Sequence, residues 1–158
     1  MEKPHIVIID DGINENEINY KIESFNVNEE DKELKTDYIS HGTYCCKIIE
    51  KYLKVDVQLS SIKILDNVGK GDAENLIKAL EIAESKKADI INLSLGSITF
   101  KDRDKILPTI NRLANKGVII VCAVHNKNYY TYPASFSNVI SKRFTETSDF
   151  ILEQLLLK

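Results

Sequence analysis

Three polar side chains lie where apolar runs end or a helix begins, and their types suit acyl-transfer chemistry. Asp10 closes one apolar run, His41 opens a predicted helix, and Asn126 follows the run Val118–Ala123. A carboxylate can hold an imidazole in one tautomer, and the imidazole can then act as a general base. A side-chain amide can donate a hydrogen bond to the oxyanion of a tetrahedral intermediate. The three residues therefore predict a site with Asp10 as orienting group, His41 as base and Asn126 as oxyanion donor.

Each of these residues alone also has a simpler interpretation. An Asp at a strand end often caps a turn, a His at a helix start often lies on the surface, and Asn is a common turn residue. Gly12 permits a sharp turn after Asp10, which would leave the carboxylate at the carboxyl edge of a sheet. The case for a catalytic site therefore depends on the three residues occurring together and in this order.

The elements that would position these residues alternate between strands and helices. Continuous apolar, β-branched runs predict strands at His5–Asp10, Asn19–Asn26, Val55–Leu65, Asp89–Leu95 and Gly117–Ala123. Helical spacing predicts helices at His41–Leu53, around Leu76–Ala83 with a cap at Asp72, and around Ile106–Ala114 with Gly117 at the end. Pro108 either starts this last helix or kinks it. The alternation predicts a doubly wound, mostly parallel α/β sheet with helices on both faces.

The string Ala88–Gly96 is an apolar run that ends in Ser94, Leu95 and Gly96. Such an ending leaves free backbone groups beside the predicted site, where an extended peptide could pair by strand addition. The plainer interpretation is a core strand followed by a turn glycine.

Several motifs in a fixed order resemble the amino-terminal two thirds of a subtilisin-like serine peptidase domain. The resemblance covers about residues 5–141 and is carried by Ile6–Gly12, His41-Gly42-Thr43, Ser61–Asp66 with Gly69 and Gly71, Asp89–Gly96, and Asn115–Asn126 followed by Tyr132–Ile140. It implies a subtilisin-like fold and peptide-bond hydrolysis by an Asp/His/Ser mechanism. It also implies that Asp10 and His41 belong to the triad, that Asn126 is the oxyanion donor, and that Ser94, Leu95 and Gly96 line the substrate cleft.

The chain departs from the family pattern in three places. Asp11 stands where the family usually has Ser or Thr, and Val124-His125 replaces a small pair before Asn126. No Gly-Thr-Ser-x-Ala string follows Asn126, and Ser148 matches it only faintly. We therefore expect residues 1–158 to form one domain that lacks its nucleophile-bearing part and is inactive alone. Half of a two-chain peptidase, with a partner chain supplying the serine, and a non-catalytic peptide-binding module are the alternatives.

The composition does not support a function in nucleic-acid or membrane binding. A net charge of −3 gives no reason to expect nucleic acid or an anionic membrane as partner, and no apolar run approaches the roughly 20 residues of a membrane span. The expected partner is a peptide or unfolded protein substrate. Three cysteines, two of them adjacent, do not form a disulfide pattern, so we expect a cytoplasmic protein.

We predict no cofactor. A structural calcium ion in the loop of residues 28–37 is the alternative that the sequence leaves open. His41 and Cys45 have the spacing of two ligands on one helix face. Two ligands make a poor zinc site, so the sequence predicts no metal centre.

Overall fold

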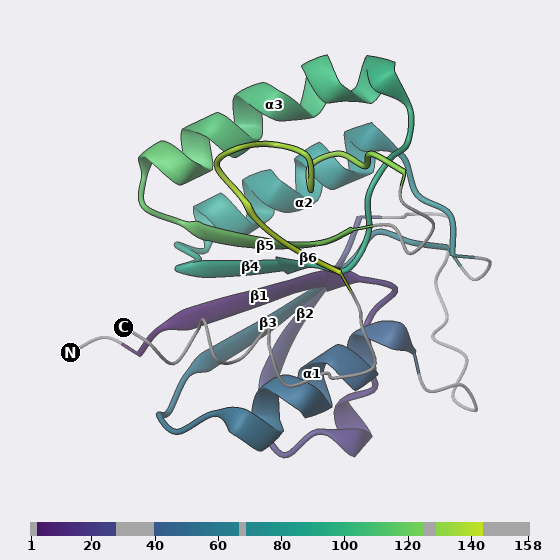
Figure 1. Cartoon of the computed structure of the whole chain (residues 1–158). Helices are drawn as coiled ribbons and strands as arrows, with labels where there is room; N and C mark the ends of the chain where they lie inside the picture. The colour runs from purple at the N-terminus through teal and green to yellow at the C-terminus, as the bar shows by residue number, and fades with distance from the viewer. Residues whose placement is uncertain (1–2, 28–39, 67–68, 125–128, 144–158) are drawn as a thin grey trace.

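The described residues form a single sheet of six parallel strands. The computed structural model describes residues 3–27, 40–66, 69–124 and 129–143. The strand order is β2-β3-β1-β4-β5-β6, and every neighbouring pair is parallel (Figure 1). The strands are β1 (His5–Asp10), β2 (Ile22–Asn26), β3 (Gln58–Lys63), β4 (Ile90–Leu93), β5 (Ile119–Val124) and β6 (Ile140–Arg143).

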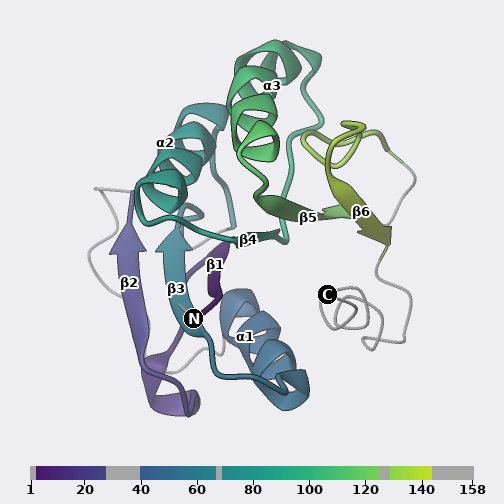
Figure 2. The ribbon, with the colours of Figure 1, turned by 90° about the vertical axis from the view of Figure 1, so that its left-hand side faces the viewer.

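Helices cover both faces of this sheet. Helix α1 (His41–Tyr52) lies on one face, whereas α2 (Ala73–Ser85) and α3 (Phe100–Asn115) lie side by side on the other, as Figures 1 and 2 show. A short 3-10 helix, η1 (Glu15–Glu17), follows β1. This arrangement confirms the predicted doubly wound parallel α/β sheet.

The central strand β1 contributes to two hydrophobic cores, one on each side. All six of its residues are buried. Because side chains alternate along a strand, Val7 and Ile9 join the core under α2 and α3, whereas Ile6 and Ile8 join the core under α1. Burying each such side chain is worth about 1.5–3 kcal/mol. A continuous apolar run is therefore what a strand covered on both faces requires.

The predicted strands exist, but most of the predicted bounds extend too far. Only β1 has the expected bounds, and the run Val55–Leu65 contains the shorter β3. Ser94 and Leu95 also leave the sheet after β4. Pro108 lies inside α3, not at its first turn, which rules out the alternative that it starts this helix.

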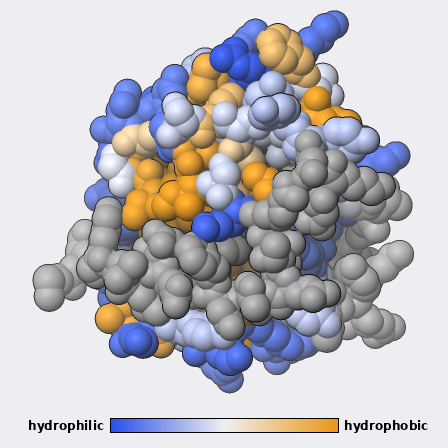
Figure 3. All heavy atoms as spheres, in the orientation of Figure 1, coloured by the Kyte–Doolittle hydropathy of each residue, from blue (hydrophilic) through white to orange (hydrophobic). Residues whose placement is uncertain are grey.

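The surface is mixed in character. Figure 3 shows a group of hydrophobic side chains in the half of the molecule that holds α2 and α3. None of the helices described is both long enough and apolar enough to cross a membrane. The predictions for residues 28–37, His125, Asn126 and Ser148 fall outside the described residues.

Candidate active site

The turn after β1 places Asp10 at the carboxyl edge of the sheet. Asp10 is 2% exposed, and its Oδ1 accepts the Asp11 N–H at 2.9 Å. Gly12 has φ of 101°, a left-handed conformation that glycine adopts without strain, as its place in the sequence suggested. The backbone thus fixes the Asp10 carboxylate and turns the chain away from the sheet.

The first turn of α1 is held against this turn by the side chains of Ser40 and Asp11. Ser40 is the N-cap: its Oγ accepts the Thr43 N–H at 3.2 Å and donates to the Gly12 carbonyl at 2.6 Å. The Asp11 carboxylate accepts the N–H of His41 at 3.0 Å and that of Gly42 at 2.8 Å. A carboxylate at a helix N-terminus also interacts favourably with the helix dipole. The hydrogen bonds to the backbone N–H groups of His41 and Gly42 therefore fix the position of His41 relative to the end of β1.

Asp10 and His41 form a close pair, as their order in the sequence predicted. Oδ2 of Asp10 lies 2.8 Å from Nδ1 of His41. The hydrogen bond to Asp10 is the largest influence on the imidazole. Together with a weaker one to Cys45, and against the opposing effect of partial burial, it raises the pKa of His41 from 6.5 to about 11. The Asp10 carboxylate is thus placed to stabilise an imidazolium.

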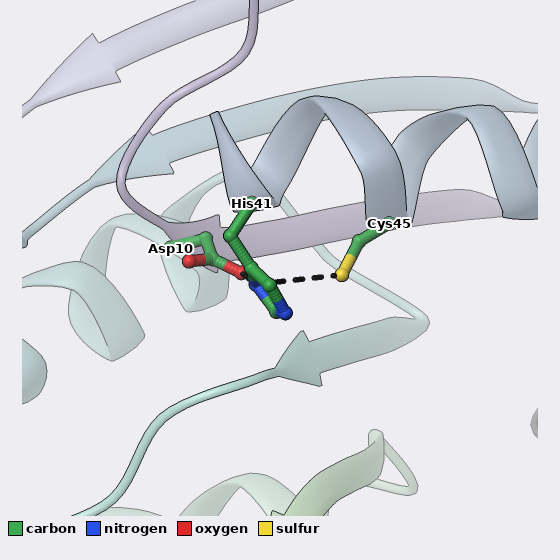
Figure 4. Close-up of side chains that lie close together, drawn as sticks. All are labelled: Asp10, His41 and Cys45. Carbon is green, nitrogen blue, oxygen red and sulfur yellow. Dashed lines mark hydrogen bonds and ion pairs between the residues drawn. The ribbon is translucent and has the colours of Figure 1, made fainter. Parts of the chain in front are cut away.

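Cys45 approaches the same ring nitrogen from the next turn of α1 (Figure 4). Its Sγ lies 3.7 Å from His41 Nδ1 and 3.3 Å from Ser94 Oγ. A nucleophilic thiol would need a ring nitrogen of its own, with the orienting carboxylate on the other nitrogen. Here both groups share Nδ1, so the geometry does not fit Cys45 as a nucleophile activated by His41.

The other two cysteines face the protein interior. Cys46 and Cys122 are each 0% exposed. Burial raises the pKa of each thiol to about 12. These two residues therefore behave as small apolar side chains.

The chain leaves β4 beside this pair and forms one wall of a groove. Asn92 donates from Nδ2 to Ser94 Oγ at 3.1 Å. Ser94, Leu95 and Gly96 line a groove of about 550 Å³, which α2 and the start of α3 complete. Among the described residues, the backbone of these three has no hydrogen-bond partner. Pairing of an extended peptide with this segment by strand addition stays a prediction.

Sequence reasoning missed the contributions of Asp11, Ser40 and Cys45 to this site. Ser40 carried a usable signal, because Ser is a favoured N-cap immediately before a helix. Asp11 acts across a tertiary contact that no local pattern shows, whereas the spacing of Cys45 from His41 indicated a shared helix face but not the contact of Cys45 with Ser94. The structure thus unites Asp10, His41 and the Ser94–Gly96 segment, while Asn126 lies outside the described residues.

The structure joins an aspartate–histidine pair to the carboxyl edge of a doubly wound sheet, which is an arrangement found in serine peptidases with an α/β fold. The model of the subtilase family matches residues 2–142, and the chain belongs to this family.

Three known proteins illustrate the likeness. The minor extracellular protease Epr of Bacillus subtilis (strain 168) is 30% identical over 112 residues, which are 64% of this chain and 17% of that protein. The major intracellular serine protease of the same organism is 27% identical over 122 residues, 67% of this chain and 38% of that protein. The crystal structure of the subtilisin-like protease Apa1 from the Antarctic psychrotroph Pseudoalteromonas sp. AS-11 superposes with a TM-score of 0.63 at 22% identity. The superposed region covers 87% of this chain and 35% of the Apa1 chain. The matched region is thus less than half the length of each of these proteins.

Proposed function

We propose that this chain is a peptidase domain that takes part in peptide-bond hydrolysis by an Asp/His/Ser mechanism. The observation that carries the proposal is the 2.8 Å contact between Asp10 Oδ2 and His41 Nδ1 on two rigid elements. Family membership supports it, since the relatives named above are proteases.

In this mechanism the two side chains have separate tasks. Asp10 accepts a hydrogen bond from the Nδ1–H of His41, which fixes the tautomer whose Nε2 carries a lone pair. Within the described part of the chain, Nε2 has no hydrogen-bond partner. A serine hydroxyl would give its proton to Nε2 as its oxygen attacks the scissile carbonyl. His41 would then pass that proton to the leaving amine, and water would repeat the sequence on the acyl-enzyme. Asn126 is the proposed donor to the oxyanion.

The serine itself is not assigned to any described residue. Ser94 is the serine that contacts this cluster, and its hydroxyl contacts Asn92 and Cys45. We therefore propose that the nucleophile comes from another segment or from a partner chain that completes the domain. A partner chain would make this protein one half of a two-chain peptidase.

The proposed substrate is a peptide or unfolded protein bound in the groove. Its walls combine the apolar side chains of Leu65, Leu76 and Ile98 with the free backbone of Ser94–Gly96. An extended peptide can pair with such a backbone while its side chains enter the apolar lining. The cytoplasm is the proposed location, because all three cysteines are free and one relative is named an intracellular protease.

The proposal is tested with the purified chain, a quenched fluorescent protein substrate and a fluorophosphonate probe that labels activated serines. Hydrolysis and labelling are expected together once the segment or partner chain that carries the serine is present, and His41→Ala should abolish both. Mass spectrometry of the labelled peptide would then identify the serine. Hydrolysis that persists in His41→Ala would overturn the proposed mechanism. If only a second chain restores hydrolysis, the labelled serine should lie on that chain.

A non-catalytic peptide-binding module is the second candidate, and the backbone of Ser94–Gly96, unpaired among the described residues, favours it. Peptide binding that survives an Asp10→Ala, His41→Ala double substitution, in a chain without hydrolysis, would support this candidate. Ile98→Glu places a charge on an exposed groove residue and should weaken binding. Val55→Glu is the matched control, because Val55 is 60% exposed and does not line the groove.

A further inference from the structure

The Asp10–His41 pair is part of a cluster of three possible metal ligands. Oδ2 of Asp10, Nδ1 of His41 and Sγ of Cys45 all lie within 4.8 Å of one another. The sequence spacing offered only His41 and Cys45, one helical turn apart. The fold brings Asp10 from β1 to the same point as a third ligand (Figure 4). The reason for dismissing a zinc site, that it had only two ligands, therefore no longer holds.

The three donors are the types that zinc binds. Zinc sites use carboxylate oxygen, imidazole nitrogen and thiolate sulfur, and sites with three protein ligands keep a fourth position for water. Tetrahedral bond lengths place nitrogen and sulfur about 3.6 Å apart, and nitrogen and oxygen about 3.4 Å apart. The Nδ1–Sγ distance is 3.7 Å and the Nδ1–Oδ2 distance is 2.8 Å. The Nδ1–Sγ distance already fits a zinc site. The Nδ1–Oδ2 distance must increase by about 0.6 Å when an ion replaces the shared proton.

The cluster is open to solvent on one side and supported on the other. The side chain of His41 is 49% exposed, whereas that of Asp10 is 2% exposed. Asp10 is held from behind by the Asp11 N–H, and Ser94 Oγ lies 3.3 Å from the Cys45 sulfur. Such outer contacts orient metal ligands and tune their affinity. An ion can therefore enter past His41 and reach three donor atoms that lie within 4.8 Å of one another, with the Asp10 and His41 atoms moving apart to admit it.

We propose that Asp10, His41 and Cys45 bind a divalent zinc ion, with water in the fourth position. Binding releases the proton of the Cys45 thiol and the proton on His41 Nδ1 to solvent, so the two deprotonated groups and the Asp10 carboxylate face the ion. The ion takes the ring nitrogen that Asp10 would otherwise orient. Zinc binding and general-base action by His41 therefore exclude each other. The binding stands independently, whereas this inhibition rests on the proposed peptidase function.

The binding is tested on the full chain without any activity assay. Calorimetric titration with Zn²⁺ should give one site per chain, and titration with Co²⁺ should give the absorption of a sulfur-to-cobalt charge-transfer band. Cys45→Ser should remove the band and weaken zinc binding by more than the roughly 10- to 100-fold that loss of an outer contact costs. Asp10→Asn should weaken it as well. Cys45→Ala repeats the test if the serine variant does not fold.

Cys46→Ala is the matched control, because this neighbouring thiol is buried and lies outside the cluster. It should keep both the band and the affinity. Equal loss in Cys45→Ser and Cys46→Ala would overturn the site, as would the absence of saturable binding. Zinc binding by a chain that hydrolyses no peptide in the presence of chelator, even with the serine-bearing partner added, supports the site and counts against the proposed function. Hydrolysis that continues at saturating zinc overturns the inhibition.

Discussion

Gly42 packs so closely against Gly12 that a Cβ on Gly42 would overlap the carbonyl oxygen of Gly12. The same Cβ would lie 3.2 Å from the Cβ of Asp10. The glycine after His41 therefore lets the start of α1 approach the end of β1. This approach brings the imidazole within hydrogen-bonding distance of the carboxylate.

Gly42→Ala should destabilise the protein by about 1–3 kcal/mol, the usual cost of forcing an extra methyl group into a packed site. Replacing a helical glycine by alanine at an open position would instead stabilise the helix. Urea unfolding followed by circular dichroism measures the free energy. Tyr44→Ala is the control, because Tyr44 is 55% exposed on the same helix and should change the stability little. A stabilised Gly42→Ala variant would refute the close packing.

Asp11→Ala should cost about 1 kcal/mol, because two N–H groups at the start of α1 lose their acceptor. Asp11→Asn keeps an acceptor oxygen and should cost less. Asp56→Ala is the matched control: Asp56 pairs with Lys3 at 65% exposure, and such surface pairs contribute little. Chemical denaturation of the three variants gives the order of their free energies of unfolding. Equal stability of Asp11→Ala and Asp56→Ala would show that the cap is unimportant.

The fold and the central pair were predictable because their signals are local or follow from the order of elements. The continuous apolar, β-branched run Ile6–Ile9 indicated a strand covered on both faces, and all six residues of β1 are buried. Strand ends in a parallel sheet share one edge, so Asp10 and the Ser94–Gly96 segment were expected near one another. His41 was placed by its position at the start of a helix.

The remaining contacts could not be predicted because they depend on how α1 is rotated and how closely it approaches the sheet. The spacing of His41 and Cys45 puts them on one helix face, but does not show that this face points toward Asp10. Asp11 caps a helix that begins 30 residues later in the chain. A motif of consecutive residues carries no information about such a distant contact.

The stability of the chain should depend on pH through His41. The folded state raises the pKa of His41 from 6.5 to about 11, so the folded chain holds this proton more tightly than the unfolded chain does. The resulting stabilisation is fully present below pH 6.5 and is lost as the pH rises toward about 11.

His41→Gln removes this titration. The stability difference between the natural chain and the variant should therefore shrink across that pH range. Urea unfolding of both proteins at a series of pH values, with chelator present, measures the difference. A difference that grows with pH would contradict the sign of the pKa shift.

Cys45 should influence the base through its contact with His41 Nδ1. The hydrogen bond between the two contributes to the raised pKa of His41, second after that of Asp10. Cys45→Ala should therefore lower the pKa of His41 while leaving the pair with Asp10 intact. Nuclear magnetic resonance of the isotope-labelled imidazole, titrated with chelator present, measures this pKa directly.

Cys46→Ala serves again as the control, because Cys46 does not contribute to the pKa of His41. If the chain hydrolyses peptides, the rise of kcat/KM with pH should shift to lower pH in Cys45→Ala, since the base then loses its proton more readily. An unchanged imidazole titration in Cys45→Ala would mean that the thiol does not bond to the ring in solution. A shift in Cys46→Ala of the same size would assign the effect to repacking of α1.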